Sequence, residues 1–175
     1  MSTVNVEPPD LSAIATRRDG LREQYLAAPG GRAPSTARGL HHVALVCSDV
    51  EQTIRFYQGL LGFPLTELVE NRDYPGSSHF FFDIGHQNLL GFFDFPGHDH
   101  ADWVETIGAL QHMALSVTAE EFDALRAKLD EAGIDYIGPD RGIDNSLYIK
   151  DPNGLGVEFY REELGLFEGE PLLDA

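Results

Sequence analysis

Cysteine, positive charge and long apolar runs are all scarce in this chain. The single cysteine, Cys47, excludes an intrachain disulfide and favours a reducing, cytoplasmic compartment. No apolar run reaches the ~18 residues of a membrane-spanning helix, and the opening MSTVNVEPPD lacks the basic and apolar regions of a secretory signal. The chain has 12 basic and 29 acidic residues. Its net charge of -17 argues against nucleic acid or an anionic membrane as a partner.

The length and apolar content are those of a folded protein. With 175 residues, 42% of them hydrophobic, the chain can form one well-buried domain or two small modules that share a core. A helix is expected from Leu11 to Ala27 behind an Asp10 N-cap, and no chemistry is assigned to it. We expect four segments: an N-terminal helix and flexible linker at 1–38, a first module at 39–97, a second module at 98–162 and an acidic tail at 163–175.

From Leu40 onward the chain repeats itself at an offset of 70 residues. Alternating and β-branched residues make both runs strands, and the residues that recur are Leu40, His42, Ala44 and Leu45 as Leu110, His112, Ala114 and Leu115. A helix start follows each strand: Ser48 with Glu51, and Thr118 with Glu121, fit capping boxes. A chance match over strand and cap together is implausible, so the repeat indicates a duplicated unit.

The rest of each repeat completes the same pattern. One apolar helix face is expected in each half, formed by Val50, Ile54, Tyr57 and Leu61 and by Phe122, Leu125 and Leu129. Gly62 and Gly133 are the expected C-caps. Three short strands should follow each helix: PLTELVE, HFFFDI and LLGFFDF, then DYIG, SLYIK and LGVEFY. The predicted fold class is α+β, with two βαβββ modules whose sheets lie together and whose helices lie outside.

The repeat separates the adjacent histidines His41 and His42. Neighbours on a strand point to opposite faces, so His41 should face solvent or the other side of the sheet. His42 and His112 are equivalent and should enter one cavity from related directions. The alternative is that both are satisfied core histidines kept by a shared packing requirement.

Glu158 supplies a third candidate ligand. It lies in mid-strand between Val157 and Phe159, where a buried carboxylate needs a partner. Exposure at a sheet edge is the alternative. Two imidazoles and one carboxylate suit Fe(II) or another first-row divalent ion with open positions, and also hold Zn(II) or Ni(II).

The first module lacks an equivalent carboxylate. Superimposing LLGFF on GVEFY places Gly91 where Glu158 lies, 49 residues after His42 against 46 residues from His112 to Glu158. We therefore expect no fourth ligand, and open space at Gly91 beside the metal.

The duplicated pattern resembles the vicinal oxygen chelate superfamily, which includes glyoxalase, bleomycin-resistance and extradiol dioxygenase proteins. The residues that carry it are LHHVALVCSDVEQTIRFYQGLLGF, LQHMALSV and SLYIKDPNGLGVEFY, and the resemblance covers about Leu40 to Arg161. It implies a cupped, partly open mixed β-sheet barrel around one metal, with His42, His112 and Glu158 as ligands.

Members of that superfamily differ in ways that bear on the reaction. Glyoxalase I-like enzymes use a fourth ligand on the last strand of the first module, from which Gly91 departs. Fosfomycin-resistance and extradiol enzymes use three, with a pocket tyrosine ten residues before the glutamate, where Tyr148 stands. Fosfomycin-type enzymes also need a cationic loop, and GPDRGIDNS offers Arg141 alone. Tyr148 could equally be a core aromatic.

The aromatic residues near the site favour a planar, chelating substrate. The pocket residues expected are Gly91, Phe82, Phe93, Ser146 and Arg141. By its approximate placement in the family, His98 is the candidate acid/base residue, although it could be an ordinary loop histidine.

These residues predict a mononuclear dioxygenase that acts on a catechol- or hydroxyquinone-like substrate. Fe(II) or Mn(II) is the favoured metal, and a homodimer is expected. One alternative is a metal-assisted lyase, isomerase or thiol transferase of the glyoxalase or fosfomycin-resistance type. Another is a non-enzymatic protein that sequesters a drug.

Overall fold

The computed structural model describes residues 10–98, 101, 103–138 and 145–166, which fall into two compact units, 1–38 and 39–175. In the first unit, α1 (Leu11–Tyr25) begins where Asp10 accepts hydrogen bonds from two backbone amides. This confirms the expected helix and cap, although the helix ends at Tyr25 rather than Ala27. A short 3-10 turn follows at Pro29–Gly31. No helix in the described ranges is long and apolar enough to cross a membrane.

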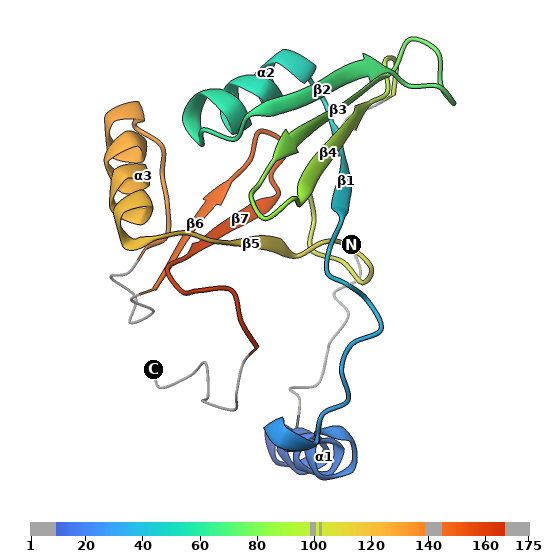
Figure 1. The fold of residues 1–175 in the computed structure, drawn as a ribbon, viewed down its shortest axis with the longest axis vertical. Coiled ribbons are helices and arrows are strands. Elements are labelled where there is room, and N and C mark those ends of the chain that lie inside the picture. The colour runs from blue at the N-terminus through green and yellow to red at the C-terminus, as the bar shows by residue number, and fades with distance from the viewer. Residues whose placement is uncertain (1–9, 99–100, 102, 139–144, 167–175) are drawn as a thin grey trace, which may run out of the picture. The chain divides into compact units, whose positions relative to one another are not determined.

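The first module forms a four-stranded sheet (Figure 1). Its elements are β1 (His42–Cys47), α2 (Val50–Ile54), the π-helical segment η2 (Arg55–Leu60), β2 (Leu65–Glu70), β3 (Ser78–Asp83) and β4 (Leu89–Asp94). The strand order is β1-β4-β3-β2, with β1 parallel to β4 and the other pairs antiparallel. The β1 strand therefore lies at an edge of its sheet.

The second module repeats this topology in a shorter form. Its elements are β5 (His112–Ser116), α3 (Ala119–Ala132), β6 (Ser146–Lys150) and β7 (Gly156–Tyr160), in the strand order β5-β7-β6. The strand expected at DYIG is reduced to one bridge between Ile137 and Tyr148. Pro139 follows directly and has no N–H for a ladder. The α+β fold of two βαβββ modules, with unclosed sheets and helices outside, is confirmed.

The start of α2 differs from the predicted one. Asp49, not Ser48, is the N-cap, and its carboxylate accepts from the backbone amide of Gln52 at 2.7 Å. The backbone amide of Ser48 instead donates to the side chain of Asn153, at 2.9 Å. The Thr118–Glu121 capping box and the left-handed Gly133 C-cap of α3 are as predicted.

One hydrophobic core joins the helix-covered sides of both sheets. Tyr57, fully buried in η2, donates to the Asp151 carboxylate of the second module at 3.1 Å. The rings of Phe63 and Phe159 also meet across the modules, with centroids 6.5 Å apart. Phe82, expected in the substrate pocket, is fully buried in this core because alternation turns it to the helix-covered side.

Candidate metal centre and substrate face

The strand registers define the equivalent positions of the two modules. Ala44 pairs with Gly91, and Ala114 pairs with Glu158. Because Ala44 and Ala114 are themselves repeat partners, Gly91 occupies the place of Glu158, as the sequence comparison predicts. The next strand in each sheet continues the row, with Phe81 beside Gly91 and Tyr148 beside Glu158.

Glu158 is a buried side chain of the second sheet whose carboxylate has several polar partners. It is only 8% exposed. Its Oε1 accepts hydrogen bonds from the hydroxyls of Ser146 and Tyr148, both at 2.6 Å. Its Oε2 lies 2.9 Å from Nε2 of His112. Burial, and then the hydrogen bond to Glu158, raise the pKa of Tyr148, so this hydroxyl remains a donor.

Both candidate histidines are held through Nδ1 by the preceding residue. The Nδ1 atom of His112 contacts Oε1 of Gln111, and Nδ1 of His42 lies 2.9 Å from Nδ1 of His41. His41 is exposed to solvent, as expected, but its ring lies beside that of His42 and not on the opposite face. Strand β1 begins only at His42, so the strict alternation of a strand does not extend to His41.

His42 is not part of the His112–Glu158 cluster. Its ring lies edge-on to Phe81, with centroids 6.1 Å apart. Within the described ranges, no group of three or more His, Cys, Asp or Glu side chains is placed to hold one metal ion. One chain thus brings together two of the three expected ligands.

The position of Gly91 is filled rather than open. A Cβ atom built on Gly91 would lie 2.8 Å from Cε1 of Phe81. The missing side chain makes room for this ring on the side of the sheet that carries His42. The expectation of empty space beside the metal is therefore wrong: an aromatic ring covers the place of the absent carboxylate.

His79 extends this aromatic surface and was not singled out from the sequence. Its ring stacks on Phe93, with centroids 3.8 Å apart and an interplanar angle of 17°, and lies 4.3 Å from the ring of Phe81. Burial lowers the pKa of His79, with the Glu67 carboxylate opposing the shift. Strand alternation in HFFFD, which puts His79 and Phe81 on one face, is the signal that could have revealed it.

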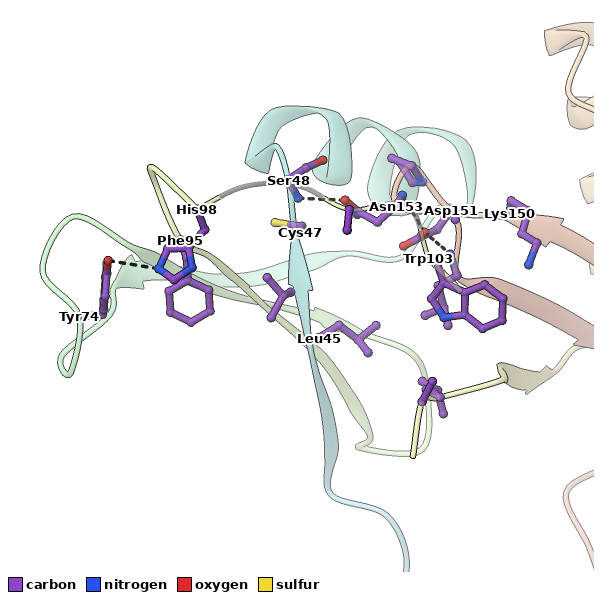
Figure 2. Close-up of a pocket in the computed structure, with 17 residues that line it drawn as sticks. Leu45, Cys47, Ser48, Tyr74, Phe95, His98, Trp103, Lys150, Asp151 and Asn153 are labelled. Atoms are coloured by element: carbon purple, nitrogen blue, oxygen red, sulfur yellow. Dashed lines mark hydrogen bonds between the residues drawn. The ribbon is translucent and has the colours of Figure 1, made fainter. Parts of the chain in front are cut away.

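A large cavity lies elsewhere, between the end of β1 and the β6–β7 turn (Figure 2). It measures about 1220 Å³ and contains none of His42, His112 and Glu158. His98 lines it, with Nε2 at 3.4 Å from the Tyr74 hydroxyl. The hydrogen-bonded carboxylate is the stronger indication of chemistry, because cavity size alone specifies no reaction. Arg141, the remaining pocket candidate, lies outside the described residues.

The donor set of the second sheet fits a divalent metal. A buried carboxylate and an imidazole nitrogen converge, while Nδ1 of each histidine is already engaged and leaves Nε2 as the natural donor. Ser146 and Tyr148 fix the carboxylate, as outer-shell groups do in metal sites. His112 and Glu158 would hold the ion, and the fold leaves a third ligand to be supplied.

The curated proteins with related sequences include a putative dioxygenase and a glyoxylase. The putative ring-cleaving dioxygenase MhqE of Bacillus subtilis (strain 168) is 32% identical over 103 residues, or 55% of this chain. The match spans only 32% of MhqE. Glyoxylase I 4 of Arabidopsis thaliana is 28% identical over 129 residues, or 71% of each chain.

Solved structures share the fold, and residues 39–159 match a family model. A putative dioxygenase from Bacillus subtilis aligns with a TM-score of 0.64 at 23% identity, over 75% of this chain and 43% of that one. A FosX fosfomycin resistance protein from Listeria monocytogenes, complexed with Mn(II) and dihydroxypropylphosphonic acid, gives 0.54 at 19% identity, over 74% and 96%. The chain belongs to the Glyoxalase/Bleomycin resistance protein/Dioxygenase superfamily.

Proposed function

We propose that the protein is a mononuclear metal-dependent dioxygenase for a catechol- or hydroxyquinone-like substrate. The observation that carries the proposal is the Glu158 carboxylate, buried between core residues and yet supplied with His112 Nε2 on one oxygen and two hydroxyls on the other. A buried charge with so many fixed partners is costly to build for packing alone. Fe(II) or Mn(II) is the favoured ion.

The proposal includes a second copy of the chain, because one chain does not complete the ligand set. The modules of one chain share their helix-covered sides, as the Tyr57–Asp151 hydrogen bond illustrates. Alternation then places both His42 and Glu158 on the side of their own sheet that faces away from this common core. In a homodimer, the partner subunit's His42 would join His112 and Glu158 and form a three-ligand site.

The chain's own residues have defined tasks in this reaction. A bound divalent ion would supply Lewis-acid activation of two vicinal substrate oxygens. Ser146 and Tyr148 keep the Glu158 carboxylate oriented and charged through their hydrogen bonds. Phe81 and Phe93, which pack against the His79 ring, form an aromatic surface against which a planar substrate ring can pack. His98 lines the separate cavity and contacts Tyr74, so its proposed acid/base role rests only on its place in the loop after β4.

The ring-cleaving relative, at 32% identity, supports the dioxygenase over the alternatives. A fosfomycin-type transferase would need cations for its phosphonate, but the Lys150 ammonium lies over the Trp103 ring, 4.6 Å from its centroid. A protein that only sequesters a drug has no need of the hydrogen bonds around Glu158. The lyase, isomerase and transferase reactions remain the competing outcome of the experiment.

Metal analysis and oxygen uptake test this function together. Protein purified without chelator should contain about one divalent ion per chain, and the Fe(II) form should consume oxygen with a vicinal diol from a panel of substituted catechols. If the protein contains no metal after reconstitution with Fe(II), Mn(II), Zn(II) and Ni(II), the proposal of a metal-dependent enzyme is refuted. Metal binding without oxygen uptake on any diol would favour the lyase or transferase.

A further inference from the structure

A second, smaller cavity lies on the same side of the first sheet as His42. It measures about 530 Å³ and is lined by Asn71, Arg72, Asp73, Tyr74, His79, Phe93 and Phe95. The register places His79 beside Phe93, and Phe93 beside Val46 of β1. Val46 and His42 are four residues apart on one strand and face the same side. The cavity is therefore a continuation of the surface that carries His42.

The second module shows what the position of His79 does. Ser146 pairs with Tyr160, which pairs with Ser116, the repeat partner of Val46. Hence His79 is the equivalent of Ser146, whose hydroxyl donates to Glu158 at 2.6 Å. In the first module Gly91 stands at the position of Glu158. His79 therefore has no carboxylate at the place where Ser146 finds one.

The structure bears this out at the atom. Nε2 of His79 is buried and has no hydrogen-bond partner among the described residues. Buried polar atoms are nearly always paired, so an unpaired one in a cavity wall requires an explanation. A half-turn about χ2 keeps the ring stacked on Phe93 and exchanges its two edges, a rotation that is soft for histidine. Nε2 is closed off from the cavity in the present ring orientation, so a ligand oxygen would complete the missing bond after this half-turn.

We propose that His79 is a substrate-binding residue that hydrogen-bonds an oxygen substituent carried by the aromatic substrate beyond its two chelating oxygens. The ring of such a substrate packs against the aromatic surface formed by Phe81, Phe93 and His79, and the extra hydroxyl or carbonyl reaches His79. The substrate class is then a vicinal diol with a third ring oxygen, rather than a simple alkylcatechol. This inference rests on the proposed function, because the surface of His79 is also that of His42.

A matched pair of ligands isolates this hydrogen bond. Hydroxyquinol carries the third oxygen, and 4-methylcatechol replaces it by a methyl group. Calorimetric titration of the Zn(II)-loaded and the metal-free protein, without oxygen, measures both affinities and needs no turnover. His79→Phe keeps an aromatic ring against Phe93 and removes the nitrogen. It should weaken hydroxyquinol binding about 3- to 10-fold and leave 4-methylcatechol unchanged.

His86→Asn is the matched control, because His86 is exposed in the β3–β4 turn with φ of 49°, which asparagine tolerates. It should change neither affinity. Equal effects of His79→Phe on both ligands, or none on either, overturn the assignment while leaving the metal site intact. If wild type binds neither ligand in either form, the aromatic substrate class and the role of His79 fall together.

Nitrogen-15 NMR gives a second measurement in the wild-type protein should His79→Phe fail to fold. Hydroxyquinol should shift the His79 ring-nitrogen resonances, and 4-methylcatechol should not. Identical shifts with both ligands contradict the hydrogen bond. If the protein binds no metal, the proposed function is refuted. The role of His79 can still be tested in that case, because the titration of the metal-free protein does not need the metal.

Discussion

At the scale of single residues, the site depends on how each ligand's remaining polar atoms are satisfied. Glu158 is buried, and its carboxylate oxygens contact two hydroxyls and one imidazole. His42 and His112 are both gripped at Nδ1, although by different side chains, His41 and Gln111. Because Nδ1 has a partner in both histidines, we expect Nε2 to be the metal-binding nitrogen of each.

Substitution of His41 tests this grip. His41→Ala removes the partner of His42 Nδ1 and should weaken metal binding about 10-fold or more, as outer-shell losses typically do. His41→Gln copies the Gln111–His112 pair of the second module and should lose much less. His42→Ala should abolish binding. Metal titration of the three variants checks the order, and an unaffected His41→Ala would mean that the His41–His42 contact does not support ligation by His42.

Substitution of Gly91 tests whether Phe81 covers the place of the absent carboxylate. Gly91→Ala brings a Cβ to within 2.8 Å of the Phe81 ring, which must then move. We expect a loss of about 1 kcal/mol of unfolding free energy, at the low end of overpacking costs. Adding Phe81→Leu should recover part of it, because residues in contact are not additive. Urea denaturation of both variants gives the answer; a fully stable Gly91→Ala would show that the ring is not held there.

At the scale of elements, the caps and turns decide where each helix begins. The Thr118–Glu121 capping box of α3 is readable from sequence because it involves only residues three apart. The same pattern at Ser48 and Glu51 misleads, since Asp49 lies next to it and is an equally good N-cap. The Ser48 amide is then used by Asn153, 105 residues away.

Alanine substitutions separate the two possible caps of α2. Asp49→Ala removes the acceptor of the Gln52 amide and should cost about 1 kcal/mol of stability. Ser48→Ala leaves its backbone bond to Asn153 intact and should stay within about 0.5 kcal/mol of wild type. Thermal unfolding of the two variants distinguishes them, and the reverse order would restore the Ser48 capping box.

At the scale of the whole molecule, the two modules of one chain meet through their helix-covered sides. This packing uses Tyr57, Asp151, Phe63 and Phe159, none of which is a candidate ligand. The edge strands β1 and β5 each keep one side without a described partner strand, and edge strands are common sites of association. The arrangement therefore favours completion of the metal site by a second copy.

Mixing two inactive variants tests a site shared between copies. His42→Ala and Glu158→Gln should each fail to bind metal. After dissociation and reassembly together, every mixed dimer regains one intact site, composed of His42 from one chain with His112 and Glu158 from the other. Metal content should recover in the mixture only. A site formed within one chain gives no recovery, because each chain lacks one of its own ligands.

The sequence by itself determined the elements and their equivalence. Strand periodicity, the Thr118 cap and the 70-residue repeat are local or translational patterns, so they predicted both modules. The superposition of LLGFF on GVEFY, at an offset of 67 residues, predicted the correspondence of Gly91 with Glu158. The sequence also predicted a ligand set of His42, His112 and Glu158, of which the structure brings His112 and Glu158 together because they lie on neighbouring strands of one module. His79 was missed although it matches Ser146 at the same offset of 67 residues, because the strands HFFFD and SLYIK have no residue in common.

The tertiary structure decided which surfaces face each other. The separation of His42 from Glu158 within one chain depends on which sides of two sheets share a core, and the single-strand pattern is the same for either choice. Phe81 covers Gly91 because a cross-strand neighbour takes the space that a missing side chain leaves. Packing between residues distant in sequence therefore determined the site, because burial depends on the partner surface as well as on the residue.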